Sequence, residues 1–318
     1  MRALITGVTG QDGSYLAEQL TAEGWEVAGL IRGQANPKRE WLERLIPSLT
    51  LVEGDLLDAT SLHRAVAGVQ PDVVFNLAAI TYAGISWPQP GIMAEVTGLG
   101  VLRVLDAIRQ ACPDARLVQA STAAMFRGSP GKSQDEGTPL APGNPYSSAK
   151  AYAHFITVNY RESYGMHAST VIMFNHESPR RGTEFVTRKI TRAVAAIARG
   201  EQDKLMLGRL DPLRDWGWAP DFMRALPLAA AQDEPGDYVL ATGEAHSVAE
   251  FCAAAFAAAG LDWKDHVVTS EGLHRPAEID ILRGNPARAR EVLGWESRVR
   301  FAEIAQRMTA HDMAGTLD

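Results

Sequence analysis

The sequence predicts an α/β protein with a doubly wound parallel sheet and a second, smaller lobe toward the C-terminus. Short and almost continuous apolar runs, such as 72–77 (DVVFNL) and 115–121 (ARLVQAS), alternate with helical stretches at the spacing of β-α-β units. Runs that are apolar at every residue are typical of parallel strands covered by helices on both faces. The length of 318 residues allows one large domain with an added lobe.

The first elements follow one another closely. Residues 2–6 (RALIT) form an apolar run that ends at a glycine, which predicts a strand. In 13–23 the apolar residues recur at helical spacing, which predicts a helix with one buried face. The apolar runs 25–31 (WEVAGLI) and 49–53 (LTLVE) predict two further strands.

The alternation continues to about residue 174. Helices are predicted over 60–68, 91–111 and 146–164, and a strand over 167–174 (HASTVIMF). With the two apolar runs named first, these segments complete the predicted sheet and its covering helices.

After residue 174 the pattern loosens. Residues 185–199 predict an amphipathic helix with Arg and Lys on its polar face, and 205–218 are rich in loop residues. Two more helices are predicted over 247–259 and 286–293. We therefore expect one domain made of residues 1–174 and about 212–241, and a smaller lobe made of residues 175–211 and 242–318. A ligand is expected in the cleft between them.

Composition excludes several classes of protein. The 31 Lys and Arg residues and 38 Asp and Glu residues give a net charge of −7, which argues against a general nucleic-acid binder. Two cysteines, Cys112 and Cys252, rule out a disulfide framework, and no ligand spacing predicts a metal site. No apolar run is long enough to span a membrane. The N-terminus lacks a signal-peptide layout, and so a cytoplasmic location is expected.

A glycine-rich loop follows the first strand. Residues 7–13 (GVTGQDG) have the pattern G-x-x-G-x-x-G and lie directly before a predicted helix. Glycines allow the tight turn and let the backbone approach a diphosphate at the helix N-terminus. The sequence therefore predicts a dinucleotide site whose contacts come from Gly7, Thr9, Gly10, Gln11, Asp12 and Gly13.

The residue after the second strand selects the cofactor. NAD-binding proteins tend to place an acidic residue there, whereas this chain has Arg32, whose guanidinium suits a 2′-phosphate. NADP is therefore favoured over NAD. Asp55 and Leu56, at the end of the third strand, are expected near the adenine.

The motif Tyr146-x-x-x-Lys150 predicts the catalytic base. Residues four apart share one face of a helix, and the Lys150 charge favours the phenolate form of Tyr146. A phenolate takes a proton from a sugar hydroxyl while hydride leaves the same carbon. Thr122, at the end of the fifth strand, is expected to hydrogen bond the reacting hydroxyl.

Together these motifs resemble the extended short-chain dehydrogenase/reductase superfamily, whose nucleotide-binding part has the Rossmann fold. Within it the chain is most similar to the GDP-mannose 4,6-dehydratase family, and the similarity extends nearly from end to end. The segments that carry it are GVTGQDGSYLAE (7–18), NLAA (76–79), TVNYRESYG (157–165), FNHESPRRG (174–182), FVTRKITRA (185–193), RDWGWAPDF (214–222) and RPAEID (275–280).

The resemblance implies an NADP-binding Rossmann domain and a lobe that binds a GDP-hexose, with the sugar over the nicotinamide. It adds Leu77, Ala78 and Ala79 to the expected cofactor contacts. It also implies a homodimer through helices 91–111 and 146–164, whereas Gly33, in place of a second basic residue, leaves a tetramer open. The matching substrate contacts are Asn175, Val186, Lys189, Arg214, Arg275 and Glu278.

One departure from the family affects the chemistry. Relatives have S-T-S-E after the fifth strand, where the glutamate acts as acid and base of dehydration, but here Ala123 and Ala124 follow Thr122. Alanine transfers no proton, and such a transfer contributes about 10²–10⁴-fold to a rate. Other departures include Ile80 in place of Gln, Arg127 in place of Gly, and Gly143-Asn144 in place of Arg-Ser.

The parts needed for oxidation at C4 are all retained, and so 4-epimerisation or a related reaction is the expected function. The alternatives are 4,6-dehydration with a relocated acid, 5,6-dehydration, reduction of a 4-ketosugar, and a catalytically degenerate protein that only binds a nucleotide sugar. Asp135, Glu136 and Glu177 are the candidate relocated acids, although Asp135 and Glu136 are expected to lie in a solvated loop and Glu177 to be structural. His176 is expected to be a packed, hydrogen-bonded residue.

Overall fold

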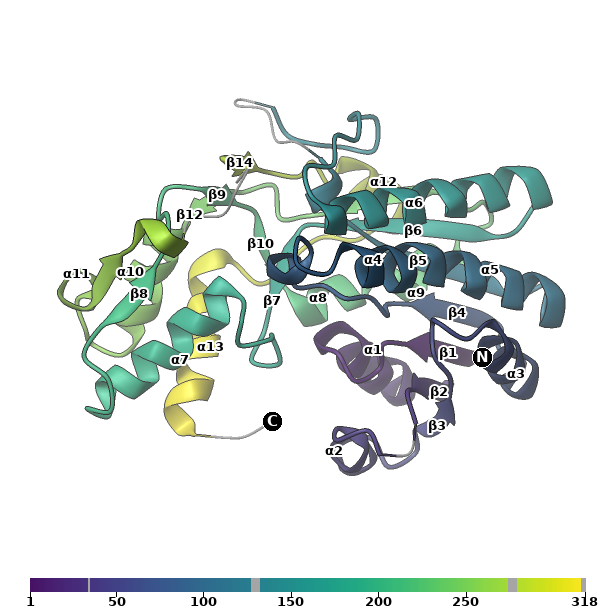
Figure 1. Cartoon of the computed structure of the whole chain (residues 1–318), viewed down its shortest axis with the longest axis horizontal. Helices are drawn as coiled ribbons and strands as arrows, with labels where there is room; N and C mark the ends of the chain where they lie inside the picture. The colour runs from purple at the N-terminus through teal and green to yellow at the C-terminus, as the bar shows by residue number, and fades with distance from the viewer. Residues whose placement is uncertain (34, 127–131, 274–278, 316–318) are drawn as a thin grey trace.

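The computed structural model describes residues 1–33, 35–126, 132–273 and 279–315, and it has the predicted α/β architecture (Figure 1). Within these residues seven parallel strands form one sheet in the spatial order β3-β2-β1-β4-β5-β6-β11. The order is doubly wound, because the chain runs outward from β1 to β3 and then continues on the other side of β1. The strands are β1 (Arg2–Thr6), β2 (Glu26–Ile31), β3 (Thr50–Glu53), β4 (Val73–Asn76), β5 (Arg116–Thr122), β6 (Ala168–Met173) and β11 (Asp237–Leu240).

Helices cover both faces of this sheet, as the apolar runs predict. Neighbouring strand residues point to opposite faces: Leu4 belongs to a core with α3, α5 and α6, whereas Ile5 belongs to a core with α1, α9 and α12. The apolar residues of each strand are therefore buried on both sides. The covering helices are α1 (Gln11–Ala22), α2 (Arg39–Leu45), α3 (Ala59–Val69), α5 (Gly100–Ala111), α6 (Pro145–Tyr164), α8 (Ala219–Met223), α9 (Ala225–Ala231) and α12 (Ala287–Leu293).

The strand β11 closes one edge of the sheet, far along the chain from its neighbour β6. Its first residue, Asp237, accepts hydrogen bonds from both terminal guanidinium nitrogens of Arg161, at 3.0 and 3.1 Å, and from the Thr170 hydroxyl at 2.8 Å. Burial opposes the charge on Asp237, but the Arg161 contact lowers the pKa of this carboxyl overall. A partly buried ion pair therefore links β11 to α6 and β6.

The helix predicted over 91–111 is interrupted. The chain forms α4 (Pro90–Met93), then a π-helical segment η2 (Ala94–Leu99), then α5. The Thr97 hydroxyl accepts a hydrogen bond from the backbone nitrogen of Ile80 at 3.1 Å, and a Cβ on Gly98 would lie 3.5 Å from the Ala149 carbonyl oxygen. The widened turn thus packs closely against α6 and against the segment after β4. Such π-turns are frequent at functional sites.

The smaller lobe lies beyond the carboxyl ends of the strands (Figure 1). The helices α7 (Val186–Ala198) and α10 (Val248–Ala258) match the predicted helices 185–199 and 247–259. A third helix, α13 (Phe301–Ala314), was not predicted, although Phe301, Ile304, Ala305 and Met308 have helical spacing. These three helices pack together around a core that includes Trp216.

Short strands accompany these helices, including three within the region 205–218 that was expected to be loop. They are β7 (Asn175–Glu177), β8 (Leu205–Leu207), β9 (Leu213–Arg214), β10 (Trp216–Trp218), β12 (His246–Ser247), β13 (Val267–Thr269) and β14 (Ile281–Leu282). The remaining short helical elements are η1 (Ala83–Ile85), η3 (Ala123–Met125), α11 (Trp263–His266) and η4 (Glu271–Leu273).

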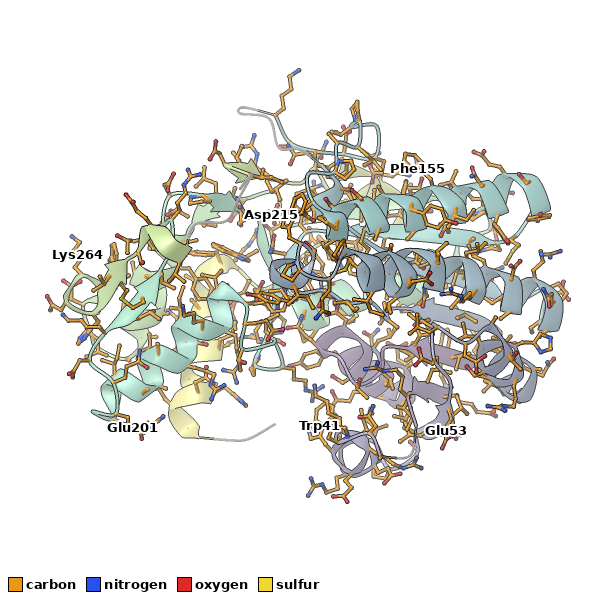
Figure 2. The ribbon with its side chains drawn as sticks, viewed as in Figure 1. Trp41, Glu53, Phe155, Glu201, Asp215 and Lys264 are labelled. Carbon is orange, nitrogen blue, oxygen red and sulfur yellow. The ribbon has the colours of Figure 1, made fainter. Side chains whose placement is uncertain are left out.

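A buried carboxylate, Asp215, joins segments at the boundary of the large sheet and the lobe (Figure 2). It accepts hydrogen bonds from the Thr242 nitrogen at 2.9 Å, the Thr242 hydroxyl at 2.6 Å, the Gly243 nitrogen at 2.9 Å and the Gly284 nitrogen at 3.2 Å. Burial raises the pKa of Asp215, although these donors favour its charged form. One side chain thus satisfies the backbone after β11 and after β14.

The domain division into residues 1–174 with 212–241, and 175–211 with 242–318, stays a prediction. The helix α12 falls within residues 242–318 of the predicted lobe, yet it packs with β11 of the large sheet and with α9, which covers that sheet. In the part of the chain that the structure describes, no helix has the length and apolar character to cross a membrane.

The Asp215 contacts generate a stability prediction. Asp215→Asn keeps the size of the side chain but turns an amide NH₂ toward backbone N–H donors, and we expect it to lower the free energy of unfolding by about 2–4 kcal/mol. Thr242→Val removes a hydroxyl that donates to Asp215 and accepts from the Glu244 nitrogen at 3.1 Å, and it is expected to lower the free energy of unfolding by about 1–2 kcal/mol. Urea unfolding followed by circular dichroism measures both. Equal stabilities of wild type and Asp215→Asn would contradict this role.

Candidate active site

The glycine-rich loop joins β1 to α1 with backbone atoms in very close contact. Gly7 has a φ of +72°, and a Cβ there would lie 2.8 Å from the Ala78 nitrogen. A Cβ on Gly13 would lie 2.3 Å from the Gly7 carbonyl oxygen, so both positions require glycine. Gly10 caps α1 without a side-chain hydrogen bond. The loop therefore fits a diphosphate bound by the first N–H groups of the helix.

Two residues of this loop bind the segment after β6. The His176 Nε2 atom lies 3.0 Å from Asp12 Oδ2, and its Nδ1 atom lies 2.7 Å from the Phe174 carbonyl oxygen. Gln11 donates to the His176 carbonyl at 3.1 Å and accepts from the Ser178 hydroxyl at 2.7 Å. Because both imidazole nitrogens face acceptors, the charged imidazolium is the form that satisfies both.

The pKa values of this pair shift in opposite directions. Burial disfavours charge on both groups, yet their attraction and hydrogen bond lower the pKa of Asp12 to about 2 and raise the pKa of His176. His176 also stacks on Phe222 with ring centroids 4.9 Å apart. Both shifts favour the charged forms of the pair, and His176 is the packed, hydrogen-bonded residue that the sequence predicted.

The three predicted catalytic residues meet near this network. Thr122 is the last residue of β5, and Tyr146 and Lys150 are buried on the first turns of α6. Asn144 begins α6 with a capping box: its side chain accepts from the Ser147 nitrogen at 2.9 Å, and the Ser147 hydroxyl accepts from the Asn144 nitrogen at 3.1 Å. Asn144 is thus a good N-cap, which fixes the helix start two residues before Tyr146.

Burial controls the electrostatics of these residues. Burial lowers the pKa of Lys150 to about 8, and its ammonium donates to the Ala120 carbonyl at 2.9 Å. Burial raises the pKa of Tyr146, while a hydrogen bond with Thr122 and the charge of Arg181 oppose that rise. In the ligand-free chain burial outweighs both effects, so the Arg181 charge only partly offsets the cost of forming the phenolate.

An apolar cluster surrounds Tyr146 where relatives are expected to have polar groups. Ala124 lies in the turn η3, and its backbone nitrogen donates to the Thr122 hydroxyl at 3.2 Å. The cluster consists of Tyr146, Met93 and Ala149, with Ile80, Ile85 and Ala124 packed against it.

The candidate relocated acids have other partners. Asp135 accepts from the Thr138 hydroxyl at 2.9 Å, and Glu136 accepts from the Val239 nitrogen at 2.6 Å. The buried Glu177 accepts from the Thr187 hydroxyl and lies 3.4 Å from Arg181. Glu177 therefore has the structural role that the sequence predicted, whereas Asp135 and Glu136 are half-buried and hydrogen-bonded rather than in a solvated loop.

Most of the predicted cofactor residues lie at the carboxyl ends of β1, β2 and β4. Arg32 is exposed directly after β2, and Leu77, Ala78 and Ala79 are half-buried directly after β4. Asp55 and Leu56 follow β3 rather than ending it, and Leu56 is buried in the core with α5.

Two cations beside the glycine loop were not predicted from the sequence. Lys38 donates to the Thr9 carbonyl oxygen at 2.9 Å, and Arg181 lies close enough to influence Tyr146, Asp12 and His176. Both residues line a cavity of about 730 Å³ between the glycine loop and the helices α7 and α13. The pattern FNHESPRRG carried a signal for Arg181, whereas only the folded chain brings Lys38 to Thr9.

The predicted substrate residues are less closely grouped. Asn175 begins β7 and Val186 begins α7, both half-buried, while Lys189 is exposed and donates to the Met206 carbonyl at 2.7 Å. Arg214 lies in β9 and donates to the Leu213 carbonyl at 2.9 Å. Arg275 and Glu278 lie outside the described residues.

Burial of Lys150 predicts opposite effects on activity and stability. Lys150→Met should slow hydride transfer by about 10²–10⁴-fold. In the ligand-free protein it should raise the free energy of unfolding by about 1–3 kcal/mol at pH 7, because an incompletely solvated charge is removed.

The pH dependence of stability checks the same point. Since the pKa of Lys150 is about 8 in the folded chain and 10.5 ordinarily, the unfolded state binds more protons between these values. Wild-type stability therefore gains a component that rises from about pH 8 to 10.5, and Lys150→Met lacks it. The exposed Lys132→Met is the control. If Lys150→Met were less stable than the wild type at pH 7, burial would not be what lowers the pKa of Lys150.

Arg32 generates a prediction about cofactor choice. Arg32→Ala should raise the Kd for NADP by about tenfold or more and leave the Kd for NAD unchanged. The reason is that the guanidinium is expected to bind the 2′-phosphate, which NADP carries and NAD lacks. Calorimetric titration measures both constants, with the exposed Arg44→Ala as the control. Equal losses of affinity for the two nucleotides would exclude a 2′-phosphate contact.

Comparisons with known proteins agree with this geometry. At the level of structure, the chain is similar to the UDP-glucose 4-epimerase of Thermus thermophilus, solved with NAD, at 29% identity and a TM-score of 0.86, covering 99% of this chain and 100% of that one. It is also similar to a dTDP-glucose 4,6-dehydratase of Streptomyces venezuelae, solved with NAD, at 25% identity and a TM-score of 0.86, covering 98% and 96%.

Sequence relatives are closer. The chain is 45% identical to GDP-mannose 4,6 dehydratase 1 of Arabidopsis thaliana over 98% of its length and 89% of the relative's. It is 42% identical to the GDP-mannose 4,6-dehydratase of Sinorhizobium fredii, over 98% and 96%. The family model described as GDP-mannose 4,6 dehydratase matches residues 4–308. The chain therefore belongs to the GDP-mannose 4,6-dehydratase family, within the extended short-chain dehydrogenase/reductases.

Proposed function

We propose that this chain is an NADP-dependent enzyme that acts on a GDP-hexose by hydride transfer at C4 of the sugar. The observation that carries the proposal is the meeting of Thr122, Tyr146 and Lys150 beside a glycine loop that only glycines permit. The names of the sequence relatives support the GDP-hexose, and Arg32 supports NADP over NAD.

The residues divide the C4 step between them. Tyr146, as the phenolate, takes the proton from the C4 hydroxyl, and Thr122 holds that hydroxyl by a hydrogen bond. The Lys150 ammonium, 2.9 Å from the Ala120 carbonyl, keeps positive charge near the phenolate. NADP, when bound, accepts the hydride from C4. The contact of His176 with Asp12, at 3.0 Å, keeps in place the loop that would hold the cofactor.

Two reactions that could follow oxidation at C4, 4-epimerisation and 4,6-dehydration, are supported by different observations. The expectation of 4-epimerisation is not confirmed, and the relatives' names favour the alternative of 4,6-dehydration. Ala124 and its apolar neighbours, together with the occupied carboxylates Asp135, Glu136 and Glu177, favour chemistry confined to C4. A degenerate binding protein is disfavoured, because such a protein does not require Thr122, Tyr146 and Lys150 together.

A homodimer through α5 and α6 is part of the proposal. These helices lie side by side on one face of the molecule (Figure 1). On α6, Tyr152 is 40% exposed and Phe155, three residues on and on the same helical face, is 54% exposed (Figure 2). Apolar side chains gathered on one helical face favour an interface. A tetramer is not part of the proposal, and the cytoplasmic location stays a prediction.

Incubation with GDP-mannose in D₂O tests the completion of the reaction. The protein, loaded with NADP, is followed by NMR and mass spectrometry. Loss of water with deuterium at C5 identifies 4,6-dehydration, and a product of unchanged mass without deuterium at C5 identifies epimerisation. Tyr146→Phe should slow either product by about 10²–10⁴-fold. Hydride transfer that survives in Tyr146→Phe would overturn the assignment of the base.

A further inference from the structure

We propose that the sugar of this site is a 6-deoxyhexose: the chain interconverts the C4 alcohol and the C4 ketone of a GDP-6-deoxyhexose, whose C6 methyl group packs on Ala124 and Ile80. This inference rests on the proposed function, because it assumes that Tyr146 and Thr122 hold the oxygen on C4. It names the substrate class of the same site.

Ala124, Ile80 and Ile85 form an apolar wall next to the reacting oxygen. The Thr122 hydroxyl accepts a hydrogen bond from the Ala124 nitrogen at 3.2 Å, so the Ala124 methyl carbon lies two bonds from an atom that contacts Thr122. Ala124, Ile80 and Ile85 pack against the cluster that contains Tyr146. A sugar whose O4 lies between Tyr146 and Thr122 therefore brings the neighbours of C4 to this wall.

The chemistry of a hexose decides which neighbour suits the wall. C4 is bonded to C3, which carries a hydroxyl in any ordinary hexose, and to C5, which carries C6. C6 is thus the substituent that becomes apolar when its own hydroxyl is missing. A methyl group gains from contact with Ile80 and Ala124, whereas a hydroxymethyl group would lose its water without finding a partner there.

Polar groups around this wall already have partners. The Thr97 hydroxyl, behind Ile80, is bound by the Ile80 nitrogen at 3.1 Å and lies 3.6 Å from the Met93 sulfur. Glu177, the buried acid near Arg181, is bound by Thr187. Among the residues that the structure describes, a C6 hydroxyl thus meets neither a hydrogen-bond partner in this cluster nor a free acid to assist its departure.

The balanced step needs no such acid. In the reducing direction hydride passes from NADPH to C4 of a 4-keto-6-deoxyhexose, the C4–O double bond becomes a single bond, and Tyr146 gives its proton to O4. NADPH is oxidised to NADP, and solvent restores the Tyr146 proton. The reaction that must supply this substrate is a 4,6-dehydration of a GDP-hexose, since that class of reaction creates both the C4 ketone and the C6 methyl.

The test compares two sugars that differ at C6 alone. Wild-type protein loaded with NADP receives GDP-mannose or GDP-rhamnose, its 6-deoxy form, and absorbance at 340 nm reports hydride transfer. We expect kcat/KM to be about 10–100-fold higher for GDP-rhamnose, the range for an apolar pocket that meets an added hydroxyl. Calorimetric titration of both sugars should show the same order of affinity.

Two variants and a control test whether the apolar wall causes the preference for the 6-deoxy sugar. Ile80→Gln and Ala124→Ser should each reduce the preference for the 6-deoxy sugar by about tenfold. Ala123→Ser is the matched control, because Ala123 lies in the same turn but is buried in a different cluster with Met125 and Phe126. It should leave the ratio unchanged.

The outcomes separate this inference from the proposed function. Equal or faster hydride transfer from GDP-mannose, or its dehydration, would overturn the 6-deoxy assignment and leave C4 chemistry on a GDP-hexose standing. An unchanged ratio in both Ile80→Gln and Ala124→Ser would also overturn it. Absence of hydride transfer with either sugar, while NADP and both sugars bind, would refute the proposed function and this inference with it.

Discussion

The ion pair between Asp12 and His176 is the interaction on which the geometry of the site depends. It joins the first turn of α1 to the point where the chain leaves the large sheet for the smaller lobe. The glycine loop is held from one side by Ala78 and from the other by this pair. The same carboxylate also acts on Lys150, where it favours the charged ammonium against the effect of burial. One contact therefore influences both the loop that would hold a diphosphate and the charge beside the catalytic tyrosine.

The parts of the site that the sequence predicted are those with short sequence separation. Tyr146 and Lys150 share a helix, and the glycines of the loop act within seven residues, so spacing alone indicates their arrangement. The partners Asp12 and His176 are 164 residues apart, and no local periodicity links them. Their proximity follows from the strand order, in which β1 and β6 direct their carboxyl ends to the same edge of one sheet. The same reason explains why Lys38 beside Thr9 was missed.

The π-helical segment and the apolar wall are a second kind of feature that the sequence alone does not predict. Ala124 and Ile80 could each be recognised as departures from the family, but neither substitution alone says what replaces the lost polar groups. The structure adds Met93 and Ile85, which come from the segments around the interrupted helix that the sequence predicted as continuous. The widening at Ala94–Leu99 depends on tertiary contacts of Thr97 and Gly98, and such contacts override helical periodicity. Fold class was therefore predictable, whereas the polarity of the pocket required the packed chain.

The late strand β11 has a consequence for synthesis. It pairs with β6 through residues 237–240, and until then β6 is an edge whose backbone N–H and C=O groups are unpaired. β11 leaves the ribosome some 60 residues after β6, which at about 5–20 residues per second is a delay of roughly 3–13 s. During that delay the nascent chain exposes an apolar strand edge that could pair with another chain. The yield of folded protein therefore depends on how β6 is protected in this interval, a kinetic requirement separate from the equilibrium stability of the finished sheet.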